Sequence, residues 1–182
     1  MVEQARLEQL DAGLTPVTDG WYVVGIPEAP WLTNEALGAA CVFEGPDVTF
    51  HHMGFTLHVL QPGQANGMYH REANQEDFLV LAGECLLLIE GEERPLKAWD
   101  FVHCPPGTDH IILGAGAGPS AFLAVGSRER GGEEGWGGYV VDEVAQRHGA
   151  GVDEPTIEAR VAYADSPPRE PTAYREGWLA GD

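Results

Sequence analysis

The sequence has little cysteine and few basic residues. Its three cysteines (Cys41, Cys85 and Cys104) are odd in number and form no close pair, so no disulfide framework is indicated and a reducing compartment is favoured. Only 10 lysine and arginine residues oppose 29 acidic ones, which gives a net charge of −19. Because such a surface repels phosphate backbones and anionic lipid headgroups, we expect neither nucleic acid nor a membrane surface as a partner.

The sequence also shows no pattern typical of a targeting signal or of a membrane span. The first residues contain no basic region followed by an apolar stretch, so no secretory signal is indicated. No apolar run approaches the roughly 20 residues that are needed to span a bilayer. We therefore expect a cytoplasmic protein of one domain with appendages, since 182 residues suffice to bury a core without disulfides or a structural metal.

Glycine and proline, by contrast, are abundant. The 24 glycines and 13 prolines favour many turns and short strands. Between residues 55 and 125, short apolar or alternating runs recur, and each is closed by a turn signal such as Pro62-Gly63. No helix pattern separates them, so a parallel βαβ architecture is excluded and an antiparallel barrel or jelly roll is favoured. The predicted strands are residues 55–60, 68–72, 78–81, 85–90, 94–97, 100–104, 110–113 and 121–125.

The remaining segments flank this barrel on both sides. Capping and periodicity predict short helices near the two ends of the chain. We expect the last segment, from Ser166, to lie as an arm across the barrel or a neighbouring subunit, and a disordered tail is the alternative. The predicted N-terminal arm (1–20) contains a helix at 2–10. The predicted barrel (21–127) has further strands at 21–24 and 39–43. The predicted C-terminal extension (128–182) contains a glycine-rich loop at 131–138 and helices at 142–148 and 153–163.

Four residues have the character and spacing of metal ligands. His70 and Glu72 are two apart on a predicted strand, so their side chains point to the same face. Glu76 follows a polar bend at the start of the next apolar run, and His110 opens another strand behind a Pro-Pro-Gly turn. Four nitrogen and oxygen donors on three strands of a small barrel can converge on one ion.

These residues stand in two motifs that resemble those of the cupin superfamily. The first family motif reads Gly, a short loop, His-any-His, three residues, Glu, six residues, Gly, and the residues in its places are Gly63, His70, Glu72, Glu76 and Gly83. The second reads Gly-Asp, a few strand residues, Pro-any-Gly, two residues, His, and the residues in its places are Trp99, Asp100, Pro105, Gly107 and His110. The resemblance covers residues 60–113 and extends to about 127. It implies an all-β cupin double-stranded β-helix, a jelly-roll barrel with short terminal helices.

The sequence departs from the family pattern at three places. The loop before His70 is one residue longer, and Trp99 replaces the glycine of the second motif, which alters a turn. Most important, Glu72 replaces the second histidine of the His-any-His pair. Glu72 could coordinate a metal, pair with an arginine inside the barrel, or mark a site that has lost its metal.

Coordination by Glu72 would change the charge of the site. Two histidines and two glutamates leave a divalent ion with a neutral shell, whereas three histidines and one glutamate leave it at +1. The neutral shell makes the ion a weaker Lewis acid and favours harder ions such as Mn²⁺ or Fe²⁺ over copper. His70, Glu72 and His110 also have the composition of a 2-His-1-carboxylate facial triad.

By resemblance, the site implies one divalent ion, Fe, Mn, Zn or Ni, held by His70, Glu72, Glu76 and His110. The first hypothesis is a metalloenzyme, dioxygenase-like or isomerase-like, that acts on a small organic molecule, with Glu76 as ligand or general base. The second is a non-catalytic cupin that binds a small ligand or a sugar. The third is a structural domain whose metal site is vestigial. For His51, His52, His58 and His103 we expect structural or solvent-facing roles.

We also expect a homodimer. Residues 78–81 are apolar on both parities, so this strand would need cover on both faces. A second sheet covers the inner face of such a strand, and a terminal arm or another subunit covers the outer face.

Overall fold

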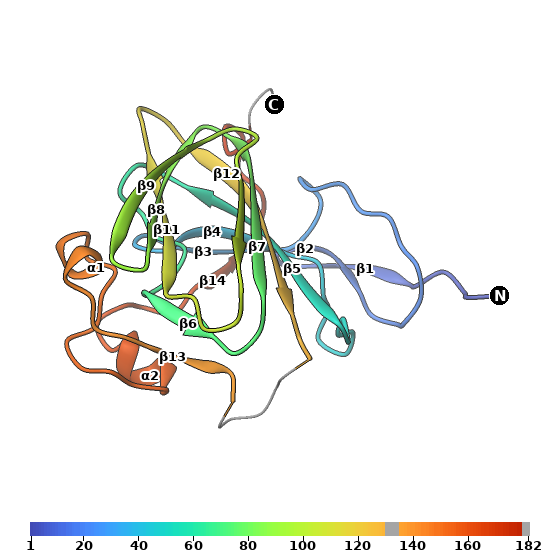
Figure 1. Cartoon of the computed structure of the whole chain (residues 1–182). Coiled ribbons are helices and arrows are strands. Elements are labelled where there is room, and N and C mark those ends of the chain that lie inside the picture. Colours follow the sequence, from blue (N-terminus) through green and yellow to red (C-terminus); the bar gives the residue numbers. More distant parts are fainter. Residues whose placement is uncertain (130–134, 180–182) are drawn as a thin grey trace.

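The computed structural model describes residues 1–129 and 135–179, and its sheets consist of antiparallel strands. Two sheets face each other and enclose the core, and no helix of the described residues interrupts the run of strands from β3 to β13 (Figure 1). The predicted all-β jelly-roll barrel is therefore confirmed. Of the predicted glycine-rich loop, residues 131–134 lie outside the described residues, as do residues 180–182 of the predicted C-terminal arm.

The larger sheet has seven strands. Its order is β10-β7-β12-β5-β4-β3-β14, and all its pairs are antiparallel. The strands are β3 (Trp31–Asn34), β4 (Gly38–Val42), β5 (Met53–Leu60), β7 (Glu76–Ala82), β10 (Phe101–Cys104), β12 (Ser120–Ser127) and β14 (Glu170–Thr172). Along β7 the side chains alternate, so Phe78 and Val80 face the barrel interior while Leu79 faces outward.

The smaller sheet has five strands and carries both histidines of the candidate site. Its order is β13-β6-β11-β8-β9, again with antiparallel pairs. The strands are β6 (His70–Glu72), β8 (Glu84–Ile89), β9 (Glu92–Lys97), β11 (His110–Ala115) and β13 (Gly137–Tyr139).

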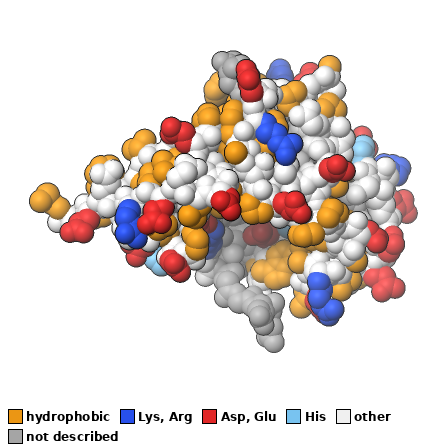
Figure 2. Space-filling view, turned by 180° about the vertical axis from the view of Figure 1, so that it is seen from behind, with side chains coloured by type: hydrophobic (Ala, Val, Ile, Leu, Met, Phe, Trp, Pro, Cys, Tyr) orange, Lys and Arg blue, Asp and Glu red, His pale blue; other side chains and the backbone are white. Residues whose placement is uncertain are grey.

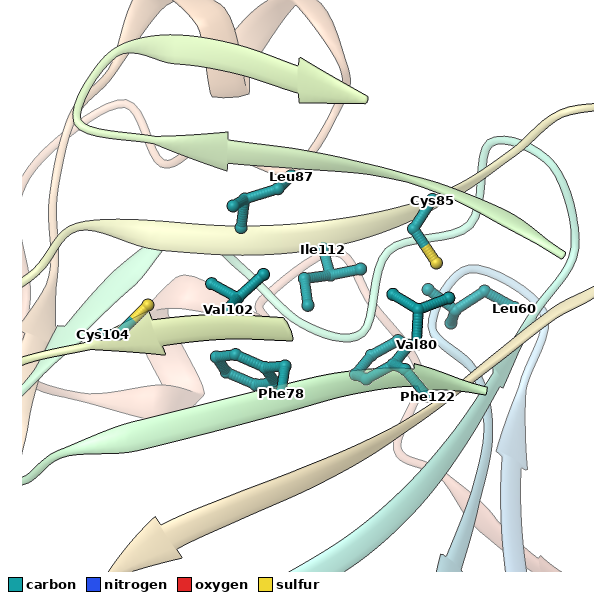
Figure 3. Packing of buried hydrophobic residues seen from close by; sticks show 9 residues of the cluster. All are labelled: Leu60, Phe78, Val80, Cys85, Leu87, Val102, Cys104, Ile112 and Phe122. Carbon is teal, nitrogen blue, oxygen red and sulfur yellow. The ribbon is translucent and has the colours of Figure 1, made fainter. Parts of the chain in front are cut away.

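The space between the sheets is filled by apolar side chains from both of them. Figure 3 shows Phe78, Val80 and Phe122 of the larger sheet against Leu87 and Ile112 of the smaller one. Phe122 and Ile112 are fully buried. The barrel therefore has a packed apolar interior.

The N-terminal segment differs from the prediction. The helix expected over residues 2–10 is absent, and strand β1 (Leu7–Leu10) instead forms a hairpin with β2 (Gly13–Pro16), which projects from the barrel (Figure 1). A nine-residue helix has too few hydrogen bonds to be stable without tertiary packing. The strand expected at 21–24 is reduced to one bridge between Gln4 and Trp21, so the barrel strands begin only at β3.

The C-terminal extension contains two short helices, on the side of the barrel opposite to this hairpin (Figure 1). Helix α1 (Glu143–Arg147) begins as predicted, because Asp142 Oδ1 accepts the backbone N–H of Ala145 at 2.8 Å. Helix α2 (Ala159–Ala162) is shorter than the predicted 153–163. The backbone of Thr156 bridges to Tyr139, which holds the preceding residues in an extended conformation.

The last described segment is an arm across the barrel's own outer face. β14 adds to the edge of β3, and the rings of Tyr174 and Trp178 pack on Trp31 at centroid distances of 5.7 and 4.9 Å. Cover by this chain, one of the predicted alternatives, is therefore confirmed for this part of the sheet.

The surface reflects the acidic composition. In Figure 2, acidic side chains are spread over the visible face and outnumber the basic ones. Among the helices of the described parts, none is long and apolar enough to cross a membrane.

Candidate metal centre

Three of the four predicted ligands meet at one end of the barrel. His70 is the first residue of β6, and His110 is the first residue of β11. The two residues are direct cross-strand partners, with ring centroids 5.1 Å apart. Glu76 opens β7 in the opposite sheet and reaches the histidines from across the barrel.

The three side chains offer their ligand atoms to one small volume. Glu76 Oε2 lies 3.3 Å from His110 Nε2 and 3.8 Å from His70 Nε2. One ligand atom from each residue lies within 4.8 Å of the other two. Glu76 Oε2 is buried and lacks a hydrogen bond of good geometry, although it is within ion-pair distance of both rings. A buried carboxylate oxygen of this kind requires a proton or a cation beside it.

The backbone fixes the orientation of both imidazole rings. His70 Nδ1 lies 2.8 Å from the carbonyl of Met68, and His110 Nδ1 lies 3.0 Å from the carbonyl of Thr108. A carbonyl only accepts, so Nδ1 must donate in each ring. In the neutral imidazole this leaves the Nε2 lone pair pointing into the site, which is the arrangement that metal-ligating histidines adopt.

The electrostatics of the two rings differ. Burial lowers the pKa of His70, and the neighbouring His110 lowers it further. Burial also acts to lower the pKa of His110, but the nearby carboxylate of Glu76 outweighs this effect and raises the pKa. His110 is therefore the ring on which Glu76 favours a proton, and a divalent cation would compete with that proton for the same position.

Glu72, the fourth predicted ligand, is not among the atoms that lie within 4.8 Å of one another. It lies two residues after His70 on β6, so the two side chains are on the same face of that strand. Burial and the charge of Glu76 raise the pKa of Glu72 to about 7. A bound cation would oppose both effects and favour the ionised carboxylate. Coordination by Glu72 stays a prediction, and the 2-His-1-carboxylate set that the structure assembles is completed by Glu76.

The donor set fits a divalent ion. Two neutral imidazoles and a carboxylate are ligands that iron, manganese, zinc and nickel accept. The side chains of His70 and Glu76 are 16 and 15 % exposed, whereas that of His110 is 3 % exposed. Solvent thus reaches the cluster on the side of His70 and Glu76.

Aromatic rings surround the histidines. Phe78 packs on His110 at 5.3 Å from inside the barrel, and Trp136 and Tyr139 approach His70 at 6.3 and 6.2 Å. Sequence reasoning missed Trp136 and Tyr139, because they lie in a glycine-rich segment that was expected to form a loop. The signal available was the Trp-Gly-Gly-Tyr sequence itself, which becomes the edge strand β13 beside β6.

The other histidines occupy the places expected of them. His58 is buried and stacks on Phe122 at 5.0 Å, away from the cluster. His103 pairs with Asp77 at 2.6 Å, and its side chain is half exposed. His51 and His52 are exposed.

The second motif keeps its turn despite the loss of glycine. Trp99 adopts φ 75°, a left-handed conformation that suits glycine better than tryptophan. Asp100 Oδ2 accepts the backbone N–H of Lys97 at 2.9 Å and closes this turn. The departure at Trp99 therefore leaves the backbone path of the motif intact.

Comparison with known proteins agrees with the fold and the motifs. Residues 56–126 match the family model of the cupin domain. An oxalate-binding protein from Thermotoga maritima is 33% identical over 66 residues, which cover 36% of this chain and 54% of that protein. The chain therefore spans about half the length of this curated relative.

Two solved structures are similar to parts of this chain. The polyketide cyclase RemF from Streptomyces resistomycificus has a TM-score of 0.52 and 15% identity, over 62% of this chain and 82% of that one. A Cupin 2 conserved barrel domain protein from Salinispora arenicola has a TM-score of 0.46 and 24% identity, over 54% and 82%. The barrel and its two motifs define a double-stranded β-helix protein. Residues 56–126 therefore form a cupin domain.

Proposed function

We propose that this protein is a metal-dependent cupin that binds one divalent ion and acts on a small organic molecule. The observation that carries the proposal is the convergence of His70 Nε2, His110 Nε2 and the buried, unpartnered Glu76 Oε2. The two histidines lie on one sheet and Glu76 lies on the opposite sheet, so the folding of the barrel brings the three side chains together. A structural domain with a vestigial site would not need both rings to be oriented by backbone carbonyls.

The residues have separate roles in this proposal. His70 and His110 hold the ion through Nε2, and Glu76 either ligates it or accepts a proton from a bound molecule. Glu72 lies beside them as the fourth donor. The ion would act as a Lewis acid that polarises an oxygen of the bound molecule. Phe78, on the interior side, packs against His110 and excludes water from behind it.

The second candidate is a cupin that binds a small ligand without transforming it. It is supported by the oxalate-binding relative, which is 33% identical over part of the barrel. Both candidates need the metal centre, so they share one first test. They separate afterwards by turnover: dioxygenase-like activity consumes oxygen, isomerase-like activity rearranges the substrate, and a binding protein returns its ligand unchanged.

Metal titration tests the centre itself. The apoprotein should bind one equivalent of Mn²⁺, Fe²⁺ or Zn²⁺, measured by calorimetry and by metal analysis of the purified protein. His70→Ala and His110→Ala should each abolish this binding, because each removes a ligand atom without supplying another. His103→Ala is the matched control, since its half-exposed ring pairs with Asp77 outside the cluster. Undiminished binding in His110→Ala would place the metal elsewhere and overturn the proposal.

A further inference from the structure

The strands that carry the two histidines share very little backbone pairing. β6 has three residues, and its only registered partner in β11 is the pair His70–His110 itself. β11, by contrast, pairs with β8 over six residues. The ladder between β6 and β11 is therefore short, and the segments are joined beyond it by single backbone hydrogen bonds from Gly107 to Glu72 and from Asn66 to Ile112.

A two-pronged ion pair joins the same two strands next to the histidines. Arg71 Nε lies 2.6 Å from Asp109 Oδ1, and its terminal nitrogen lies 2.7 Å from Oδ2. Arg71 follows His70, and Asp109 precedes His110. Because neighbouring residues on a strand point to opposite faces, the pair lies outside the barrel while the imidazoles point inward. A bidentate pair of this kind fixes direction as well as distance.

Asp109 is itself held in place by a neighbouring turn. Its backbone N–H donates to Glu90 Oε1 at 2.9 Å, and its carbonyl accepts the backbone N–H of Glu90 at 3.0 Å. On the other side, β13 pairs with all three residues of β6. The ion pair thus connects two separately anchored segments, and each segment carries one of the imidazoles.

We propose that Arg71 and Asp109 are positioning residues that set the separation of His70 and His110 for metal binding. The inference rests on the metal centre proposed above and assigns a role to a pair that touches no ligand atom. Loss of a residue that orients metal ligands typically weakens metal affinity by about 10–100-fold. We expect an effect of that size from breaking the pair, with the four candidate ligands left intact.

The test compares this pair with a second two-pronged ion pair. Arg128 meets both carboxylate oxygens of Glu44, at 2.7 and 2.6 Å, and it joins segments that carry none of the ligands. The side chains of Arg71 and Asp109 are 47 and 18 % exposed, and those of Arg128 and Glu44 are 37 and 17 % exposed. Arg128→Met is therefore a matched control for Arg71→Met.

The measurements are the dissociation constants for Mn²⁺ and Zn²⁺, the visible spectrum of the Co²⁺-loaded protein and the melting temperature of the apoprotein. Arg71→Met and Asp109→Asn should each weaken binding by about 10–100-fold and alter the Co²⁺ spectrum, which reports ligand geometry. Arg128→Met should do neither, even if it lowers the melting temperature as much. The double variant Arg71→Met/Asp109→Asn should bind no more weakly than the weaker single variant, because the two residues act as one unit.

The outcomes separate this inference from the proposed function. A parent protein that binds no divalent metal would overturn the proposed centre. A parent that binds metal, with Arg71→Met and Arg128→Met indistinguishable in affinity and spectrum, would overturn the positioning role alone. The swapped variant Arg71→Asp/Asp109→Arg should recover part of the affinity. If metal affinity falls in every variant only in proportion to the loss of apoprotein stability, the pair stabilises the fold and does not position the ligands.

Discussion

At the level of single residues, Glu72 distinguishes this site from the common cupin pattern. It takes the place of a histidine, and its raised pKa shows the cost of a second buried carboxylate next to Glu76. A divalent ion removes that cost. We therefore propose that the same residue sets both the charge of the site and its preference among metals.

Substitution of Glu72 should separate these effects. Glu72→Ala should weaken metal affinity by about 10–100-fold, as expected for loss of a ligand or of its support. Glu72→His should keep the binding, shift the preference toward softer ions, and change the charge of the shell from 0 to +1. Titration of the apoproteins with Mn²⁺, Fe²⁺ and Zn²⁺ measures both. If Glu72→Ala binds as tightly as the parent, Glu72 is not a ligand.

His58 should make stability depend on acidity. Burial, and secondarily the charge of Arg169, lower its pKa from 6.5 to about 3. As the pH falls below the unfolded value, the unfolded chain takes up the proton first, so the folded state loses stability from about pH 6.5 down to about pH 3. Above this window the ring is neutral in both states, and its contribution is constant.

The variant His58→Phe keeps an aromatic ring against Phe122 and removes the titrating group. Between pH 4 and 6 the slope of unfolding free energy against pH should fall by up to about 1.4 kcal/mol per pH unit relative to the parent. Urea unfolding at several pH values measures it. A slope equal to that of the parent would show that His58 is not the acid-sensitive group.

At the level of elements, the C-terminal arm is held on the barrel by a few identifiable side-chain contacts. Arg169 donates to the carbonyls of Leu37 and Asn66 at 2.8 and 3.0 Å, where its side chain enters the body of the protein. Beyond β14, Trp178 packs on Trp31. A buried guanidinium and a large ring hold the arm at two separate points.

Trp178→Ala should therefore release the end of the arm. We expect a loss of about 2 kcal/mol in unfolding free energy, below the value for a fully buried ring because Trp178 is only partly buried. Val23→Ala, at a side chain that is 81% exposed, is the control and should change stability by less than about 0.5 kcal/mol. Chemical denaturation gives both values, and limited proteolysis should cut the C-terminal segment faster in Trp178→Ala. Equal stability of the two variants would contradict the anchoring role.

At the level of the whole molecule, the outer face of the larger sheet is only partly covered. The register places Phe101 beside Leu79, and Leu79 beside Leu123, in one apolar row. Phe101 is 64% exposed and Trp99 is 74% exposed, the latter in a backbone conformation that suits glycine better. A large exposed ring kept at such a position is consistent with a contact surface.

The homodimer predicted from the apolar strand is therefore expected to form through this face. Light scattering of the parent at micromolar concentration should give the mass of a dimer, and Phe101→Glu should shift it toward the monomer because the new charge would be buried in the interface. Val141→Glu, which also adds a charge at an exposed apolar side chain, is the control. A monomeric parent would leave the arm as the only cover that this sheet has among the described residues.

The sequence by itself determined the barrel and most of the candidate site. Turn signals and alternating apolar residues are local, so the bounds of β5 to β12 could be predicted to within two residues. The motif spacing identified His70, Glu76 and His110, because strands at fixed registers bring fixed positions together. The cap at Asp142 was equally local and was predicted correctly.

Only the tertiary structure decided what depends on partners distant in the chain. Residues 7–10 form a strand because β2 and not their own periodicity determines their hydrogen bonds. Trp136 and Tyr139 come beside His70 because β13 pairs with β6 across a gap of more than 60 residues. The pairing of Arg71 with Asp109 likewise joins residues 38 apart. No local pattern specifies such contacts, since their geometry arises from packing and strand order, which the chain acquires only when the barrel closes.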